Sequence, residues 1–370
     1  MNEYIEMGEK YNRRKSFKER AEANREKRLS ENEAEFILAL ETSCDETSAA
    51  VITSRDGRPE IISHEVASQI EDHKKFGGVV PEIASRRHLE LIRPMINSAL
   101  EQAGVDSTQL TAAAATRGPG LVGALLVGFA AGKALAYAEE IPFLGVNHIA
   151  GHIFANFLVH EDIELPFLCL TVSGGHTDLI YFSRMIEYEI LGRTRDDAAG
   201  EAFDKIARRL ELGYPGGPAI EKKAREGNPE AVELPRALSE SESYDFSFSG
   251  LKTAVINYIH NQQQKGNEID TADLSASFQR AVIESLLPQV ERAIKNFEPE
   301  ALLLAGGVSA NSLLRSRFES LTEEHELSLY LPPLDLCTDN AAMIGAAAYY
   351  QLAAGHSHDL GLDVKANLSL

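Results

Sequence analysis

The chain has 370 residues, 44% of them hydrophobic, and a formal net charge of −20 at pH 7. This length favours two domains with hydrophobic cores of their own. The three cysteines, Cys44, Cys169 and Cys337, lie far apart, which argues against a disulfide framework and for a reducing compartment. An acidic chain repels polyanions, so nucleic acid as a partner would require local basic patches, whereas a metal cation suits the charge.

Residues 1–35 differ from the rest of the chain. They hold nine basic and nine acidic side chains, so all the excess acid falls on the remainder. A helix over 13–28 would be polar on every side, and we therefore expect a flexible or loosely helical extension, with a partner-binding or RNA-binding arm as the alternative. The charged N-terminus does not resemble a secretory signal, and the longest apolar stretch, 121–138, contains three glycines and a lysine. We expect a cytoplasmic protein with no membrane partner.

The first half of the folded chain reads as an α/β domain. Apolar runs at 36–40 and 49–53 flank the polar turn 41-ETSCDETS-48, which predicts a β-hairpin. A third strand near 60–67 and a long helix within 73–104 follow. A small-residue strand at 110–116 then enters the loop 118-GPGLVG-123, which opens a helix, and a strand at 142–146 comes next. Glycine loops at strand-to-helix junctions are typical of α/β folds.

The segment 147-NHIAGHIFANF-157 places His148 and His152 four residues apart. On a helix, both imidazoles then lie on one face and form half of a site for a divalent metal. Two unrelated histidines remain the alternative. Asp339, in 335-DLCTDN-340, is a candidate third ligand, although the same position before a helix also suits an N-cap.

The strand, turn and strand pattern recurs at 166–182, with 173-SGGHT-177 in the turn. Helices near 200–212, 216–227 and 273–297, a strand-turn-helix at 301–321 and a last helix at 339–355 complete the chain. We therefore expect duplicated α/β domains with a central cleft, over 36–147 plus 340–360 and over 148–339. Glycine turns let the backbone approach a phosphate group closely, so these turns could bind a nucleotide. None of them is a Walker A motif.

These motifs together resemble the TsaD family, the universal tRNA N6-adenosine threonylcarbamoyltransferases. The resemblance spans about residues 36–350 and rests on 42-TSCDETS-48, 77-GGVVPEIASR-86, 118-GPGLVGALLVG-128, 147-NHIAGH-152, 172-VSGGHT-177, 199-AGEAFDK-205, 214-YPGGP-218, 245-DFSFSGLKTA-254, 305-AGGVSAN-311 and 338-TDNAAMIG-345. It implies a duplicated actin-like, ribonuclease-H-like ATPase-type (ASKHA) fold. It also implies transfer of threonylcarbamoyl from threonylcarbamoyl-AMP to the N6 amine of the adenosine 3′ of the anticodon, in tRNAs that read ANN codons, with release of AMP.

The resemblance also implies site residues. His148, His152 and Asp339 would hold one divalent metal per subunit, Fe²⁺ first and Zn²⁺ as the alternative. The positions expected to contact the nucleotide-bearing substrate are Thr171, Val172, Ser173, Gly174, Gly175, Asp204, Gly217 and Asn311. Thr171 stands where the archaeal branch has a tyrosine ligand, which leaves the fourth ligand open. Asp45 or Glu46 could accept the amine proton, or merely hydrogen-bond the local backbone.

Partners follow from the same resemblance: tRNA, a TsaB-like homologue forming a heterodimer, and a TsaE-like ATPase, with a homodimer as a further option. Basic residues that could meet tRNA are Lys74, Lys75, Arg86, Arg87, Arg193, Arg195, Arg208 and Arg209. Three rival functions are weaker. A zincin metalloprotease needs Glu where this chain has Ile149, a metabolite kinase gives the histidine pair no role, and a non-catalytic scaffold would tolerate loss of His148.

Overall fold

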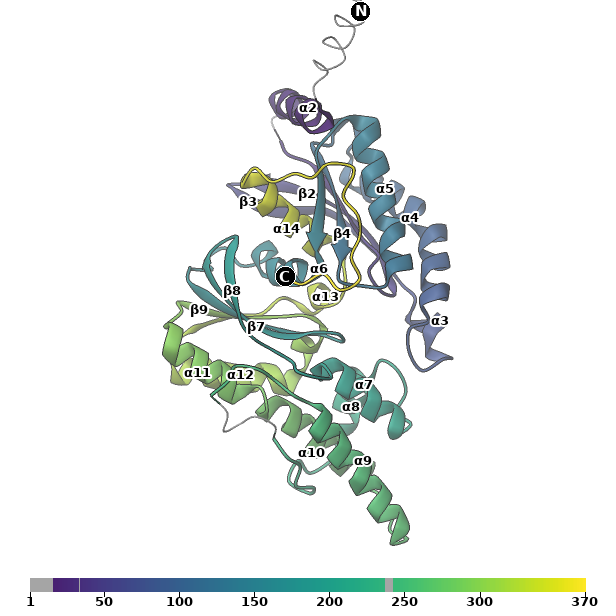
Figure 1. Cartoon of the computed structure of the whole chain (residues 1–370), viewed down its shortest axis with the longest axis vertical. Coiled ribbons are helices and arrows are strands. Elements are labelled where there is room, and N and C mark those ends of the chain that lie inside the picture. The colour runs from purple at the N-terminus through teal and green to yellow at the C-terminus, as the bar shows by residue number, and fades with distance from the viewer. Residues whose placement is uncertain (1–15, 33, 237–241) are drawn as a thin grey trace, which may run out of the picture. The chain divides into compact units, whose positions relative to one another are not determined.

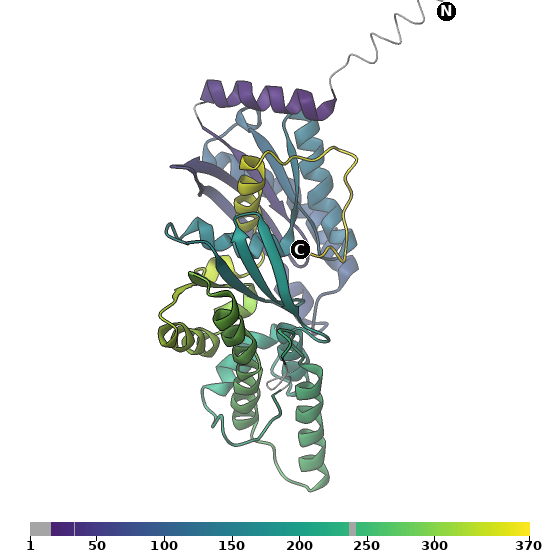
Figure 2. The ribbon, with the colours of Figure 1, turned by 60° about the vertical axis from the view of Figure 1, so that its left-hand side comes forward.

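The structure is a computed structural model that describes residues 16–32, 34–236 and 242–370. The chain folds into two compact units (Figures 1 and 2). Unit 1 contains residues 1–67, 85–148 and 340–370, and unit 2 contains 68–84 and 149–339. The sequence-based division gave 68–84 to the first domain and His148 to the second, ended the first domain at residue 360, and set residues 1–35 apart as an extension.

Unit 1 is built on a five-stranded sheet in the order β3-β2-β1-β4-β5. Strand β1 pairs antiparallel with β2 and parallel with β4, and β4 pairs parallel with β5. The strands are β1 (Ile37–Glu41), β2 (Glu46–Arg55), β3 (Arg58–Ser68), β4 (Ala112–Gly118) and β5 (Phe143–Asn147). The helices in this part of the chain are α2 (Phe17–Asn32), α4 (Pro81–Ala103), α5 (Val122–Glu139) and α14 (Ala341–Ala353), with the short 3-10 turn η1 (Ser107–Gln109).

Strand alternation explains how this sheet is covered. Leu38 and Leu40 share a buried cluster with residues of α4 and α5. The intervening Ala39 faces α14, where a Cβ on Gly345 would lie 3.2 Å from the Cβ of Ala39. Because successive side chains in a strand point to opposite faces, α5 and α14 cover the two faces of the sheet (Figure 1). Both faces are therefore apolar, which explains the long alanine and leucine runs.

Unit 2 repeats this topology. Its sheet has the order β8-β7-β6-β9-β10, with an antiparallel β6–β7 hairpin and parallel β6–β9 and β9–β10 pairs. The strands are β6 (Phe167–Val172), β7 (Thr177–Arg184), β8 (Glu187–Arg193), β9 (Ala301–Ala305) and β10 (Ser328–Tyr330). The corresponding strand orders are identical, so the fold is a duplicated α/β architecture, as the sequence predicted, and it agrees with the actin-like ATPase type that the family resemblance implies.

The helices of unit 2 lie largely on one face of its sheet, where α7, α9, α10, α11 and α12 contribute to one hydrophobic core. Helix α6 and the turn η2 supply Phe154 and Phe157, which pack on Phe182 and Phe167 of the sheet. The elements are α3 (Ile70–Lys74), α6 (His148–Phe154), η2 (Ala155–Leu158), α7 (Ala199–Arg209), α8 (Gly216–Ala224), α9 (Ser249–Gln264), α10 (Thr271–Glu284), α11 (Leu287–Phe297), η3 (Gly307–Ala310), α12 (Ser312–Glu324) and α13 (Leu334–Cys337).

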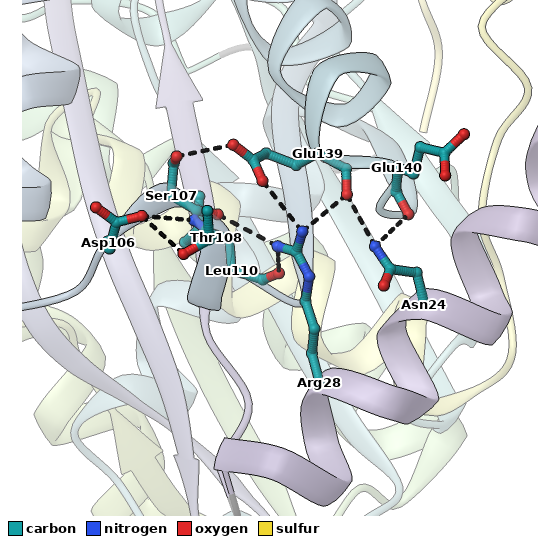
Figure 3. Close-up of polar contacts among 8 residues, drawn as sticks. All are labelled: Asn24, Arg28, Asp106, Ser107, Thr108, Leu110, Glu139 and Glu140. Carbon is teal, nitrogen blue, oxygen red and sulfur yellow. Dashed lines mark hydrogen bonds and ion pairs between the residues drawn. The ribbon is translucent and has the colours of Figure 1, made fainter.

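Helix α2, within the extension expected to be flexible, lies across one end of unit 1 (Figure 2). Arg28 donates to the carbonyl oxygens of Leu110 at 2.7 Å and Glu139 at 2.9 Å, and Asn24 donates to those of Glu139 and Glu140 (Figure 3). Polar groups therefore attach this helix, together with buried Ala21 and the ring of Phe17, which stacks on Tyr137. Hydrophobic periodicity detects apolar stripes, so it gave no sign of the attachment.

Helix α5 is long and apolar enough, by length and composition alone, to cross a membrane. This differs from the expectation that the glycines and the lysine would exclude such a segment. Leu125 and Phe129 on α5 are buried against the sheet of unit 1, as in the core helix of an α/β domain. Its exposed face carries Val122, Leu126 and Tyr137.

Candidate active site

The histidine pair lies on α6, which begins at His148 directly after β5 ends at Asn147. Both imidazoles are buried, with 7% of His148 and 1% of His152 exposed. The sequence predicted a helix here, and a helix places residues four apart on the same face. Burial of both imidazoles excludes two surface histidines, whereas a pair in which one caps and one packs is also compatible with burial.

Asp339 joins this pair. Its Oδ1 lies 3.1 Å from Nε2 of His152, and one ligand atom from each of His148, His152 and Asp339 lies within 4.8 Å of the others. The alternative role of Asp339 as an N-cap is wrong, because the neighbouring Asn340 caps α14 by accepting from the N–H of Met343 at 2.9 Å. Asp339 is thereby left to face the imidazoles.

The donor set fits a borderline divalent metal. Two imidazole nitrogens and one carboxylate oxygen are the ligands that zinc and non-haem ferrous sites use, and three protein ligands leave positions open for substrate. Ligand atoms that share an ion 2.0–2.2 Å away from each lie roughly 3 to 4 Å apart. The His152–Asp339 distance of 3.1 Å lies in this range, and all three atoms lie within 4.8 Å of one another, so the group could hold one ion.

Glu41, at the end of β1, lies behind His148 and was missed by the sequence analysis. Its side chain is fully buried, and its Oε2 lies 3.0 Å from Nδ1 of His148. Thr116 donates to the same oxygen at 2.6 Å, and the N–H of Ser43 donates to the other carboxylate oxygen. A glutamate at the end of a buried apolar strand is unusual, because a buried charge needs partners. This sequence pattern could have identified Glu41 as a functional candidate.

The predicted proton acceptors lie in the turn after Glu41. Asp45 is 6% exposed, and Glu46 begins β2. Buried His88 braces this turn: its Nδ1 lies 2.7 Å from Oγ1 of Thr47, and its Nε2 lies 3.0 Å from the carbonyl oxygen of Cys44. A rigid turn of this kind can hold a carboxylate in a fixed position, as general-base catalysis requires.

Thr171 and Val172 are fully buried at the end of β6, and the turn 173–176 follows them. The N–H of Ser173 donates to the carbonyl oxygen of His176 at 2.8 Å, and the N–H of His176 donates to Oγ of Ser173 at 3.1 Å. Ser173 and His176 thus close the turn themselves. Gly174 and Gly175 are exposed, and a Cβ on either would meet nothing within 4 Å. The backbone of the turn is therefore accessible to a ligand at these two glycines.

The remaining predicted contact residues gather around the same turn in unit 2. A Cβ on Gly200, at the start of α7, would meet the carbonyl oxygen of Ser173, and one on Gly306 would meet that of Val172. One helical turn along α7, Asp204 accepts from the N–H of Gly216 at 2.7 Å, which holds the start of α8 and the adjacent Gly217 against α7.

Asn311 is the N-cap of α12. It accepts from the N–H of Leu314 at 3.0 Å and donates to Gln279 at 2.9 Å. This capping contact follows directly from the N-cap preference of asparagine. Its position at the end of the turn 305–311 nevertheless keeps the start of a helix beside the other glycine turns.

Several of the basic residues considered for tRNA contact have acidic or carbonyl partners in their own unit. Arg87 pairs with Glu90 at 2.7 Å, and Arg195 pairs with Asp245 at 2.9 Å. Arg208 donates to the carbonyl oxygen of Gly77, which ties the 77–86 segment to α7. Solvent-exposed pairs of this kind reduce the positive field available to a polyanion.

Comparison with known proteins bears on the family of this chain. The TsaD family model, described as tRNA N6-adenosine threonylcarbamoyltransferase, matches residues 60–346, which include the histidine pair and Asp339. Relatives carrying that same name include one from Clostridioides difficile strain 630, 51% identical over 90% of this chain and 98% of its own length. Another, from Symbiobacterium thermophilum, is 56% identical over 90% of this chain and 97% of its own.

Two solved structures share the fold at low sequence identity. The phosphate-bound and nucleotide-bound form of full-length HypF has a TM-score of 0.56 at 14% identity, covering 86% of this chain and 56% of that one. HypF from T. kodakarensis has a TM-score of 0.57 at 13% identity, covering 87% of this chain and 48% of that one. These likenesses bear on the fold alone.

Proposed function

The chain belongs to the TsaD family of tRNA N6-adenosine threonylcarbamoyltransferases, and we propose how its residues perform that transfer. In the proposed reaction the N6 amine attacks the carbamoyl carbon of threonylcarbamoyl-AMP, the bond from that carbon to the phosphate oxygen breaks, AMP leaves and the amine loses a proton. The acceptor is the adenosine 3′ of the anticodon in tRNAs that read ANN codons. The grouping of His148, His152 and Asp339 is the observation that carries the site assignment.

We propose that these three residues hold a divalent metal, Fe²⁺ or Zn²⁺. When bound, such an ion supplies positive charge that orients the threonyl group and polarises the carbonyl. The protein residues fix the geometry: α6 sets the two imidazoles on one face, and Asp339 approaches from the start of α14. Thr171 is fully buried at the end of β6, where it supports the turn that would contact the substrate.

The glycine turns are proposed to hold the AMP portion. The exposed backbone of Gly174 and Gly175 can donate N–H groups to the departing phosphate, where negative charge develops. Asp204 is half-buried and can accept from a ribose hydroxyl, with Gly217 and Asn311 lining the approach. An adenine amine is a weak nucleophile, so positioning of this kind is the main contribution expected of the protein.

Asp45 and Glu46 are the proposed proton acceptors. Asp45 shares the turn 42–45 with Ser43, whose Oγ lies 3.2 Å from Nδ1 of His148, so the turn is tied to the residue beside the proposed reaction centre. A carboxylate there can accept the proton released when the new C–N bond forms.

The proposed function is tested by transfer from chemically supplied threonylcarbamoyl-AMP to unmodified tRNA, followed by mass spectrometry of the nucleosides. We expect modified adenosine and released AMP in equal amounts. Absence of the nucleoside in the presence of the partner subunits would contradict the proposal, and undiminished modification by the His148→Ala variant would favour a non-catalytic scaffold. The assay is run with and without a TsaB-like homologue and a TsaE-like ATPase, which are the partners we propose. We also propose that the protein acts in the cytoplasm, where tRNA is found.

For the TsaB-like partner we propose the exposed apolar surface of α4 and α5, with a homodimer on the same surface as the alternative. Leu89 on α4 is 66% exposed, and Val122 and Leu126 on α5 are 49% and 46% exposed. The two helices touch, since a Cβ on Gly123 would lie 2.5 Å from Oγ of Ser85. Exposed apolar surface shared by two adjacent helices is typical of a protein interface.

Replacement of Leu126 by aspartate places a charge in this surface, and we expect at least a tenfold loss of affinity for the TsaB-like homologue. The measurement is titration of the labelled homologue. Ile186, in the β7–β8 turn of unit 2, is a matched control at 39% exposure, and Ile186→Asp is expected to bind normally. Equal losses in both variants would contradict the assignment of the surface.

A further inference from the structure

Glu41 is a buried carboxylate with three polar contacts, two of which come from definite donors. The N–H of Ser43 donates to Oε1, and the hydroxyl of Thr116 donates to Oε2 at 2.6 Å. Oε2 also lies 3.0 Å from Nδ1 of His148. A fully buried charge is tolerated only when it is paired and hydrogen-bonded, so the three contacts are what keeps this carboxylate in the core.

These contacts fix which nitrogen of His148 carries the proton. If Nδ1 were unprotonated, its lone pair would face the carboxylate oxygen at 3.0 Å, and two acceptors would repel each other. Ser43 Oγ lies 3.2 Å from the same nitrogen and could donate to it, but that hydrogen bond would leave the repulsion in place. The arrangement is stable when Nδ1–H donates to Glu41 and Nε2 keeps its lone pair.

We propose that Glu41 is a positioning residue that holds His148 in the Nδ1–H tautomer and presents the Nε2 lone pair to a divalent metal. A ligating imidazole commonly donates its other N–H to a carboxylate, which orients the ring and makes the ligating nitrogen more basic. Here β1 contributes the carboxylate and the start of α6 contributes the imidazole. The inference rests on the proposed metal site.

A purely structural role is the competing explanation, because Glu41 also joins the turn after β1 to Thr116 on β4. The two roles differ in what they affect. A structural carboxylate influences folding stability alone, whereas a positioning carboxylate also influences the tautomer of His148 and the affinity for metal of the folded protein.

The first measurement uses the full chain without substitution. Histidine labelled with ¹⁵N is followed by NMR in the metal-free protein, and the signals of His148 are assigned by their loss in His148→Gln. We expect a protonated Nδ1 and an unprotonated Nε2 at neutral pH. The Nε2–H tautomer in this protein would overturn the proposal, whatever the variants do.

The second measurement is the dissociation constant for Zn²⁺, determined by competition with a chelator. Glu41→Gln keeps the shape of the side chain but replaces one acceptor oxygen by a donor, and we expect affinity to fall by about 10- to 100-fold. Thr116→Val is the matched control, since it removes one donor to the same carboxylate and leaves the contact with His148; we expect a change below about threefold. Circular dichroism establishes that each variant is folded.

The outcomes separate this inference from the proposed metal site. If His148→Ala with His152→Ala leaves Zn²⁺ affinity unchanged, the metal site itself is wrong. If that double variant loses Zn²⁺ while folded Glu41→Gln binds it as the wild type does, the metal site stands and the positioning role of Glu41 is overturned.

Discussion

At the scale of single residues, the sequence located the metal-site candidates but not their supports. His148 and His152 are visible because their spacing matches one helical turn, and Asp339 was identified only as either ligand or cap. The structure excludes the cap, because Asn340 takes the capping contact, and it places Asp339 beside His152; the ligand role is our proposal. Glu41 was missed because its role depends on β1 and α6 coming together, residues that are distant in the sequence.

Asp178 on β7 provides a residue-scale test of the fold. Burial raises the pKa of its carboxyl to about 6, against the opposing effect of the Arg193 guanidinium 3.7 Å away. The folded state therefore binds this proton more tightly than the unfolded state, whose Asp pKa lies near 4. Between these two values folding stability falls as pH rises, by an amount on the order of 3 kcal/mol.

Asp178→Asn removes this titration. We expect the free energy of unfolding of the variant minus that of the wild type to increase by that amount between about pH 4 and pH 7, which means that the variant becomes relatively more stable. Urea denaturation across this pH range measures the difference. A difference that stays constant with pH would contradict a raised pKa for Asp178.

At the scale of elements, the hairpins and the glycine-loop helices followed from local sequence, whereas attachments made by polar groups did not. Helix α2 is the main example. The last turn of α5 contains no lysine or arginine, and Arg28 supplies the positive charge at that end from a different helix. A cation beside the final carbonyl groups of a helix is favoured by the helix dipole. Figure 3 shows these contacts around Glu139.

Replacement of Arg28 by alanine tests this attachment. Its guanidinium, 11% exposed, pairs with the Glu139 carboxylate at 3.1 Å as well as with the backbone carbonyls. We expect a loss of about 2 kcal/mol in the free energy of unfolding and faster hydrogen exchange at the end of α5. Arg20→Ala is the control, because the pair of Arg20 with Glu140 is exposed, and its effect should stay below about 1 kcal/mol. Equal losses would contradict a specific clamp.

At the scale of the whole chain, the duplicated topology was predictable because both halves repeat strand, polar turn and strand before their glycine loops. The membership of 68–84 in unit 2 was not, since it depends on Arg208 reaching the carbonyl oxygen of Gly77, 131 residues away. Composition alone was also misleading about partners: a net charge of −20 argued against nucleic acid, yet the chain belongs to a family of tRNA-modifying enzymes.

The most direct test of the central claim couples metal content to transfer in one preparation. Wild-type protein and the variant with both His148→Ala and His152→Ala are analysed for bound metal by elemental mass spectrometry, then supplied with threonylcarbamoyl-AMP, unmodified tRNA and the partner subunits. We expect one divalent ion per wild-type chain, and loss of both the ion and at least 100-fold of the transfer rate in the folded variant, a change of roughly 3 kcal/mol in the barrier. Undiminished transfer by a metal-free variant would contradict the account.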